Sequence, residues 1–442
     1  MIDPLRLGRT AALLLAAALP LAEPALAQRL TPAETTMTRT VDADYDRSVA
    51  LLETLVNQNS GTLNLAGVTR VGARMRTELE PLGFIVTWKP MDAVQRAGHL
   101  IAVHKGRPGT KRLLLIGHLD TVFEPNSPFQ KFVRKSDLAE GPGAGDDKGG
   151  MVVIIAALRA MQAAGTLKNA NIEIVLTGDE EKSGSPHSIA RADLIAAGKR
   201  ADVALDFEGL VIDGGRDMGS IARRSAIDWR ITATGKTGHS SGIFGPGVGD
   251  GAINELARIL AAFRKELPEP NLTFNTGVIA GGARATLTES GDAVAAGKTN
   301  IIPQTAIAIG DFRTLSPEQT IRVRAKMEAI VAAHAPETNA RIEFGEGYPA
   351  MAPTDGNRAL LAALNGVNRD LGLAEMPALD PLKRGAGDVS FVAADVDSLA
   401  GLGPYSTGDH APGETVDLPS IRRQAKRAAI LMSRLSAERS VR

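Results

Sequence analysis

The chain has 442 residues, of which 44% are hydrophobic and 23% are charged, and this length predicts two domains or one large one. The composition is that of a soluble globular protein and excludes a coiled coil, a collagen or a wholly disordered chain. Fifty basic residues balance fifty acidic ones, so we expect no nucleic-acid partner. Because the chain has no cysteine, disulfides, thiolate metal sites and cysteine nucleophiles are excluded, and any metal must be bound by nitrogen and oxygen.

The first segment has the pattern of a secretory signal peptide. Arg6 and Arg9 precede an apolar run over 11–19, and Ala25 and Ala27 are small residues at the two positions that a signal peptidase reads. An anchoring helix is the alternative, but the run is too short to cross about 30 Å of hydrocarbon. We therefore expect cleavage after Ala27 and a periplasmic or secreted protein that has no membrane contact after cleavage.

Short β-rich runs alternate with helical patterns in the first half of the mature chain. The predicted strands are 84–88, 100–103, 112–116, 172–176 and 203–206, and the predicted helices are 46–58, 67–82, 149–164 and 188–197. Strands that alternate with helices of this length predict crossover connections. The expected fold class is therefore α/β, with a mixed, largely parallel sheet flanked by helices.

The pattern changes from about residue 220. Two β-α-β units follow, with strands near 227–233, 272–279, 305–311 and 341–344 and helices at 252–265 and 318–333. They predict a small α+β domain inserted into the first one, because the later helices 357–371, 388–394 and 418–435 would pack back on the first sheet. The expected organisation is a signal peptide over 1–27, a catalytic domain over 28–217 and 348–442, and an inserted domain over 218–347.

One imidazole and several carboxylates follow the predicted strands and turns of the α/β sheet. They are His118, Asp120, Asp146, Asp147, Glu180, Glu181, Asp206 and Glu208. Ligands bind at the carboxyl ends of the strands in open α/β sheets. Each pair alone has an ordinary explanation as an N-cap or a solvated helix start, but so many carboxylates at one edge would repel one another without a cation. Histidine and carboxylates without thiolates are typical of zinc, cobalt or manganese, and fit calcium poorly.

Seven motifs occur in the order seen in the co-catalytic zinc aminoacylases and carboxypeptidases. They are GHLDTV, GPGAGDDKGG, TGDEEKSG, ADVALDFEG, GKTGHSSG, TNIIPQTAIAIGDFR and GPYSTGDHAPGETVDL. The chain resembles this family from about residue 51 to residue 435, and most of all its bacterial periplasmic glutamate carboxypeptidase branch. The resemblance implies a di-zinc exopeptidase fold in which the inserted domain is a lid and also joins two subunits into a homodimer.

The resemblance also implies two zinc ions per subunit, with cobalt or manganese possible. Their ligands would be His118, Asp146, Glu181, Glu208 and His410. Asp146 would bridge the two ions, and a cis peptide bond would follow it. The choice of Asp146 over Asp147 rests on the G-x-G-x-x-D spacing that starts at Gly141.

Further roles are implied by the same motifs. Asp120 would hold the free ring nitrogen of His118, and Glu180 would be the general base. His239 of the lid would stabilise the developing oxyanion in the partner subunit's active site. The substrate carboxylate would be held by Asn300, Arg313 and the loop around Gly385, with Arg384 as a second candidate.

Together these features predict an exported di-metal hydrolase that cleaves the amide bond next to a carboxyl-terminal amino acid. Its substrate would be a small peptide or an N-acyl amino acid, so an N-acyl-amino-acid deacylase or a dipeptidase is the alternative within the family. The lid motif reads GHSSG, where the carboxypeptidase has serine before the histidine and alanine after it. This departure leaves the details of the substrate pocket open.

Two alternatives lie outside this chemistry. Gly238–Gly242 fits the G-x-S-x-G pattern of serine hydrolases with Ser240 as nucleophile, but the glycine-rich sequence after it cannot begin a helix at once, as a nucleophile elbow requires. A non-catalytic binding protein that kept the fold is the other alternative. It would be expected to have lost Glu180 or a metal ligand, and the chain has kept all of them.

Overall fold

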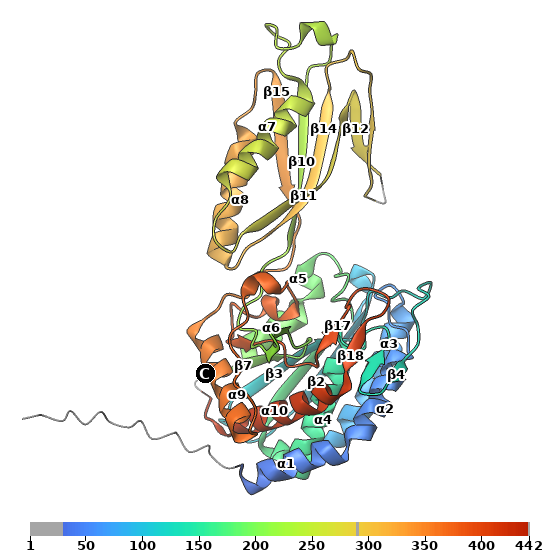
Figure 1. The fold of residues 1–442 in the computed structure, drawn as a ribbon, viewed down its shortest axis with the longest axis vertical. Helices are drawn as coiled ribbons and strands as arrows, with labels where there is room; N and C mark the ends of the chain where they lie inside the picture. The colour runs from blue at the N-terminus through green and yellow to red at the C-terminus, as the bar shows by residue number, and fades with distance from the viewer. Residues whose placement is uncertain (1–29, 289–290, 441–442) are drawn as a thin grey trace, which may run out of the picture.

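The computed structural model describes residues 30–288 and 291–440, and the predicted signal peptide lies outside the described residues. Two units are visible in Figure 1, one built around a six-stranded sheet and one around a four-stranded sheet. Within the described ranges, no helix is long and apolar enough to cross a membrane.

The six-stranded sheet has the order β1-β2-β6-β3-β7-β16. Its strands are β1 (Ile85–Met91), β2 (Arg96–His104), β3 (Arg112–His118), β6 (Asn171–Thr177), β7 (Val203–Asp206) and β16 (Ser398–Leu399). β3 runs parallel to β6 and β7, and β7 runs parallel to β16, whereas β1 and β2 are antiparallel to their neighbours. The prediction of a mixed, largely parallel sheet is confirmed.

Helices cover both faces of this sheet, which explains why its central strand is apolar at every position from 113 to 116. Leu113 and Leu115 of β3 belong to the core shared with the helices of one face, and Leu114 and Ile116 belong to the core of the other face. The first face carries α1 (Pro32–Ala43), α2 (Tyr45–Val56), α3 (Leu65–Leu79), α4 (Lys148–Ala163), α9 (Asp355–Asp370) and α10 (Leu418–Ala437). The second face carries α6 (Ala192–Arg200).

Three local predictions need correction. The predicted helix 188–197 is two helices, α5 (His187–Ala190) and α6, which meet at Arg191. The predicted helix 388–394 is only a short 3-10 turn over Asp388–Phe391. The stretch before residue 45 also forms α1, where the side chains of Thr31 and Glu34 make a reciprocal capping box.

The second unit is an antiparallel sheet in the order β11-β14-β10-β15. Its strands are β10 (Ile227–Gly235), β11 (Thr273–Gly282), β14 (Thr305–Arg313) and β15 (Thr338–Phe344), and its helices are α7 (Gly251–Glu266) and α8 (Pro317–Ala332). Both helices lie on one face of the sheet (Figure 1), where Leu256 and Met327 belong to the same buried core as Trp229. A hairpin of β12 (Arg284–Leu287) and β13 (Ala293–Ala296) lies beside it. We refer to this unit as the lid.

The chain enters and leaves the lid through two segments that pair with each other. Residue 223 bridges residue 351, and residue 226 bridges residue 348, both in antiparallel orientation. We call these two segments, 223–226 and 348–351, the hinge ribbon. It lies close to the boundaries 218 and 347 that we propose for the lid from the sequence.

A small four-stranded sheet brings the last part of the chain to the edge where β3 ends. Its order is β17-β18-β5-β4, with β4 (Val133–Lys135), β5 (Leu138–Glu140), β17 (Ser406–Thr407) and β18 (Thr415–Asp417). The loop 408–414 between β17 and β18 therefore lies beside the glycine-rich loop 141–147 that follows β5. This pairing places His410 next to Asp146, although the two residues are 264 positions apart in the sequence.

Candidate metal centre

His118 is the last residue of β3, and its ring is held between two aspartates. The imidazole is almost fully buried, and its Nε2 lies 2.8 Å from Oδ1 of Asp146. Its Nδ1 lies 3.1 Å from the backbone oxygen of Asp120 and 3.4 Å from the Asp120 carboxylate. Asp120 is therefore in position to fix the orientation of the His118 ring.

Asp146 also contacts a second histidine, which lies on the loop 408–414, far away in the sequence. Nε2 of His410 lies 3.0 Å from Oδ2 of Asp146 and 3.1 Å from Oε2 of Glu181. The two carboxylate oxygens of Asp146 thus face two different imidazoles. The peptide bond between Asp146 and Asp147 is cis, as the resemblance implied.

The donor set of this cluster fits a metal ion. One ligand atom each of His118, Asp146 and Glu181 lie within 4.8 Å of one another. Imidazole nitrogens and carboxylate oxygens without thiolates are the set that zinc, cobalt or manganese accepts. The pairing of His410 with both Asp146 and Glu181 adds a second imidazole to the same cluster.

The histidines and carboxylates of this cluster shift one another's pKa values. Hydrogen bonds to Asp146 and Glu181 raise the pKa of His410 to about 11. Burial opposes the charged form of His118, but hydrogen bonds to Asp120 and Asp146 outweigh it and raise the pKa well above its ordinary value. Burial raises the pKa of Glu181 to about 7. The raised pKa values mean that negative charge is concentrated at this site. A bound cation would neutralise that charge and displace the protons.

Asp120 also organises the loop that follows β6. Its carboxylate accepts hydrogen bonds from the backbone N–H groups of Glu180 at 3.0 Å and Glu181 at 3.1 Å, and from the Thr62 hydroxyl at 2.6 Å. His118 lies opposite Thr177 in the parallel β3–β6 pair, so this loop begins beside the histidine. Burial and the nearby Glu208 raise the pKa of the Glu180 carboxyl well above its ordinary value. Strand β6 ends at Thr177, so Glu180 lies in a bend and Glu181 in the turn after it, and neither is on an extended strand.

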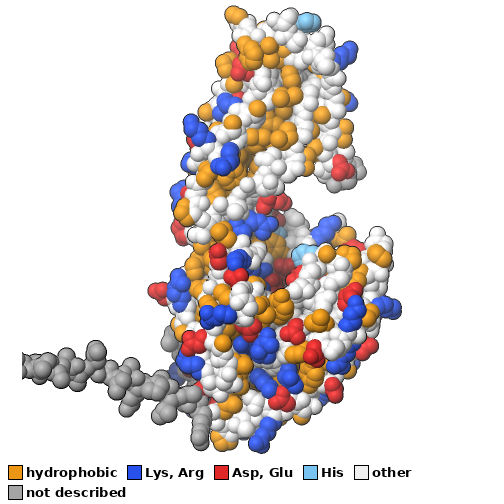
Figure 2. All heavy atoms as spheres, viewed as in Figure 1, with side chains coloured by type: hydrophobic (Ala, Val, Ile, Leu, Met, Phe, Trp, Pro, Cys, Tyr) orange, Lys and Arg blue, Asp and Glu red, His pale blue; other side chains and the backbone are white. Residues whose placement is uncertain are grey.

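Glu208 lies at the same edge but pairs with arginine. Its Oε2 is 2.5 Å from Nη1 of Arg223 and 3.5 Å from Nη2 of Arg384. Glu208, Asp146 and both arginines line one cavity of about 270 Å³. The structure therefore brings Glu208 to the cavity that Asp146 lines, while its carboxylate faces the guanidinium groups. Figure 2 shows acidic and histidine side chains gathered in the hollow between the two units.

Two residues of this site were missed from the sequence. Arg223 is buried, and besides Glu208 it contacts Asp206 at 3.2 Å. The buried Glu414 accepts backbone hydrogen bonds from Gly143, Gly145 and Asp146 at 2.8 to 3.1 Å. A signal was available for Glu414, because it follows His410 by four residues in the motif HAPGE. Nothing in the local sequence distinguishes Arg223 from Arg224.

The lid residues expected to contact substrate fall into two groups. Nη1 of Arg313 lies close to the Gly385 loop: the distance from Nη1 to the position that a Cβ would occupy on Gly385 is 3.5 Å. Both residues line a cavity of about 400 Å³. Asn300 and His239 lie elsewhere: the Asn300 carbonyl accepts from the Ser240 N–H, and Nδ1 of His239 lies 2.8 Å from the Ser241 hydroxyl. Their loops are at the end of the lid farthest from the sheet of the catalytic domain (Figure 1).

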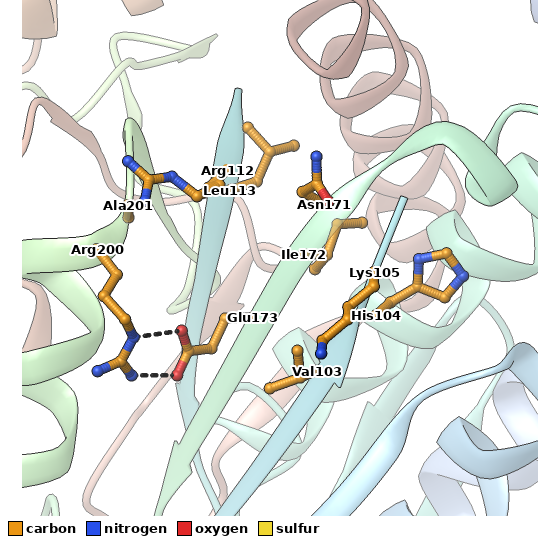
Figure 3. A pocket seen from close by; sticks show the side chains of 10 residues that line it. All are labelled: Val103, His104, Lys105, Arg112, Leu113, Asn171, Ile172, Glu173, Arg200 and Ala201. Carbon is orange, nitrogen blue, oxygen red and sulfur yellow. Dashed lines mark hydrogen bonds and ion pairs between the residues drawn. The ribbon is translucent and has the colours of Figure 1, made fainter. Parts of the chain in front are cut away.

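Two other features of the molecule do not form a second reaction centre. The GHSSG segment itself ends in a 3-10 turn over Ser240–Gly242, and the next α-helix begins only at Gly251, so no nucleophile elbow forms. A cavity of about 330 Å³ lies at the opposite ends of β3 and β6 (Figure 3). There Arg200 pairs with Glu173 at 2.6 Å, far along the strands from His118.

A largely parallel α/β sheet that carries imidazoles and carboxylates at its carboxyl edge defines a class, the metal-dependent hydrolases. Residues 114–434 match the family model described as Peptidase family M20/M25/M40, and the chain belongs to this family. It is therefore a hydrolytic enzyme of the metallopeptidase and amidohydrolase type.

Three similar proteins span nearly the whole chain. Carboxypeptidase G2 of a Pseudomonas species is 28% identical over 407 residues, which cover 88% of this chain and 89% of that protein. Succinyl-diaminopimelate desuccinylase of Leptothrix cholodnii is 23% identical, covering 85% of this chain and 95% of its own. The crystal structure of a dinuclear metal-binding peptidase of Bacillus subtilis superimposes with a TM-score of 0.61 at 16% identity, covering 89% of this chain and 99% of that one.

Proposed function

We propose that this chain is an exported, zinc-dependent carboxypeptidase that cleaves the amide bond before a carboxyl-terminal amino acid, with glutamate as the first substrate to test. The single observation that carries this proposal is that His118 and His410 contact opposite oxygens of the Asp146 carboxylate. The similarity to carboxypeptidase G2 supports the same reaction.

The residues that would hold two zinc ions are His118, Asp146, Glu181, Glu208 and His410. Two such ions supply Lewis-acid polarisation of the scissile carbonyl and a lower pKa for a nearby water molecule. Asp120 keeps the His118 ring oriented, as its contact with Nδ1 supports. Both arginine contacts of Glu208 are made by its Oε2, so its Oε1 is the oxygen that would bind an ion.

Glu180 would be the general base. It accepts the proton of the attacking water and returns it to the leaving amine, which requires a carboxyl group at the site that is not itself a ligand. Its partly buried carboxyl group, whose pKa is raised by desolvation and by Glu208, supports this role, because a raised pKa makes the protonated carboxyl easier to use as the acid in the second step. Its neighbour Glu181 contacts His410 instead, so the two glutamates can divide the two tasks.

The substrate carboxylate would be bound where the lid meets the Gly385 loop. The cavity beside Asp146 and the cavity beside Arg313 share residues 383–385. Lys383, Arg384 and Arg313 therefore line two neighbouring cavities beside the cluster, where Arg313 pairs with Asp311 at 3.1 Å. Arginine can bind a carboxylate through two parallel hydrogen bonds, which supports Arg313 for this task.

Dimerisation through the lid, the partner subunit's use of His239 and export stay proposals from the sequence. The dimer is supported by the edge strand β11, where Val278 and Ile279 are exposed although both are large and apolar. His239 precedes the 3-10 turn Ser240–Gly242, in a loop at the far end of the lid (Figure 1), and this supports a role in a second subunit better than a role in its own. Asn300, on the neighbouring loop, would likewise contact the substrate bound in the partner subunit's active site.

The substrate class is tested by an assay of amino-acid release with zinc-loaded protein. The panel contains N-acyl glutamate, other N-acyl amino acids, dipeptides and succinylated amines. Fastest release of carboxyl-terminal glutamate supports the carboxypeptidase, whereas preference for other N-acyl amino acids or dipeptides supports the alternative that the desuccinylase similarity suggests. Absence of release from the whole panel would overturn the proposed function.

One arm of this assay tests Arg313. Replacing the terminal carboxylate of the best substrate by an amide is expected to raise KM by about 10- to 100-fold, because a charge-assisted hydrogen bond is worth roughly 1.5–3 kcal/mol. Arg313→Ala should raise KM for the acid and leave KM for the amide nearly unchanged. Arg341→Ala, which removes an exposed arginine of the same lid, is the control. Equal rates for acid and amide would exclude Arg313 as the carboxylate-binding residue.

A further inference from the structure

The hinge ribbon contacts the loop that carries the proposed general base. Within the ribbon, the backbones of Ala226 and Tyr348 exchange hydrogen bonds of 3.1 and 2.9 Å, and those of Arg223 and Met351 exchange two of 2.9 Å. These four bonds fix the ribbon at the point where the lid joins the catalytic domain. Tyr348 is therefore part of the connection between the lid and the catalytic domain.

The side chain of Tyr348 reaches from this ribbon to Glu180. Its hydroxyl donates a hydrogen bond of 2.7 Å to the backbone oxygen of Glu180 and accepts one of 3.0 Å from Nη2 of Arg191. Its ring packs against Phe391, with the ring centroids 4.9 Å apart, and against His187 at 5.8 Å. The hydroxyl is thus held on both sides, and its position is set by packing.

Arg191 ties this hydroxyl to the rest of the loop. The guanidinium is fully buried and pairs with Asp179 at 2.6 Å and with Asp388 at 2.7 Å. Asp388 also accepts a hydrogen bond of 2.5 Å from the hydroxyl of Thr177, the last residue of β6. Buried networks of this kind are stiff, because each group that loses a partner pays its full desolvation cost.

A second contact joins the other end of the same loop to the chain just before the ribbon. The carboxylate of Glu346 accepts hydrogen bonds of 3.0 Å from the Ser185 hydroxyl and from the His187 N–H. The segment 346–348 therefore holds the loop 180–187 at both of its ends. None of these side chains is a candidate metal ligand, and the Glu180 carbonyl shares its peptide group with Glu181, so zinc content is measured together with turnover.

We infer that Tyr348 is a positioning residue that sets the place of Glu180 through its backbone carbonyl and couples it to the hinge of the lid. The inference rests on the proposed function, in which Glu180 is the general base. A displacement of about 1 Å at a reacting group can cost on the order of a hundredfold in rate. A single hydrogen bond from the hinge to that residue is therefore sufficient to matter for turnover.

The test is Tyr348→Phe in the full-length, zinc-loaded protein, because this change removes only the hydroxyl. We expect kcat to fall about tenfold, the order expected for one buried hydrogen bond, with KM changed less than about twofold and zinc content unchanged. Amide hydrogen exchange of peptides covering 178–187 should become faster, because the loop opens more often. Tyr45→Phe, on α2 with its ring against Arg422, is the matched control and should match the wild type in all four measurements.

The outcomes separate this inference from the proposed function. Unchanged kcat and unchanged exchange at 178–187 would overturn the inference, and so would a loss of activity that comes entirely from lost zinc or a lower melting temperature. Should Tyr348→Phe fail to fold, Glu346→Ala at an exposed position gives the second test, and wild-type kcat with wild-type exchange would then also overturn it. If the wild type releases nothing from the substrate panel, the proposed function fails, while the exchange measurement still decides whether Tyr348 positions the loop.

Discussion

Replacing Glu180 by alanine is expected to lower kcat by a factor of about 10² to 10⁴, the range that a general base contributes, while zinc content stays at the wild-type level. The physical reason is that its carboxyl group is partly buried and lies near Glu208 and His118, while the neighbouring Glu181 pairs with His410. Glu180→Gln should behave in the same way, because the amide keeps the shape of the side chain and cannot accept the proton.

Two comparison variants make this result specific. Glu181→Ala should lose zinc as well as turnover, because its carboxylate belongs to the cluster of candidate ligands. Glu173→Ala lies on the same strand β6, at the cavity of Figure 3, and should keep both. Steady-state kinetics and elemental analysis of the same samples give the two readouts. Wild-type turnover in Glu180→Ala would rule out its role as the base.

Replacing His118 or His410 by alanine is expected to weaken zinc binding by on the order of a hundredfold or more, since even residues that only orient a ligand contribute 10- to 100-fold. The two sites differ in burial: the side chain of His118 is 2% exposed and that of His410 is 56% exposed. His118→Ala should therefore also lower the melting temperature, whereas His410→Ala should not. His334→Ala, in the lid, serves as the control. Wild-type zinc affinity in either variant would contradict the ligand assignment.

The same histidines predict the pH dependence of zinc binding. In the metal-free protein the pKa of His410 is raised from 6.5 to about 11, and that of His118 is also raised. Since these pKa values are higher in the folded state, proton binding to the two histidines stabilises the folded protein without zinc, and this stabilisation is fully present below pH 6.5. The contribution of His410 to the folding free energy is lost as the pH rises through about 11. Zinc must displace these protons, so its apparent affinity should rise between pH 6 and pH 8. Calorimetry in buffers of different ionisation enthalpy should detect proton release on binding.

The strands could be predicted from the sequence because burial leaves a strong pattern in them. The run Leu113–Ile116 is apolar because both faces of β3 are covered, and the acidic residues after it fall at the sheet edge where the parallel topology requires them. Helix α1 lies outside the elements predicted from the sequence, although the capping residues Thr31 and Glu34 mark its start. A capping box is a local signal, so the sequence alone is sufficient to predict this helix start.

Other features depend on contacts between distant segments, which spacing alone does not reveal. His410 reaches Asp146 because β18 pairs with β5, and only the resemblance to the family indicated this meeting in advance. The pairing of Arg223 with Glu208 and the contact of Tyr348 with Glu180 both depend on the hinge ribbon. The sequence predicted an inserted domain but gave no register for the two segments that connect it.

The most direct test of the account is the number of zinc ions that one wild-type chain binds around Asp146. Native mass spectrometry of the zinc-loaded protein should show two ions per chain, and the count should fall when either His118 or His410 is replaced. A chain that binds no zinc, or that keeps two ions after Asp146→Ala, would contradict the central claim that the two histidines and this carboxylate form one dinuclear centre.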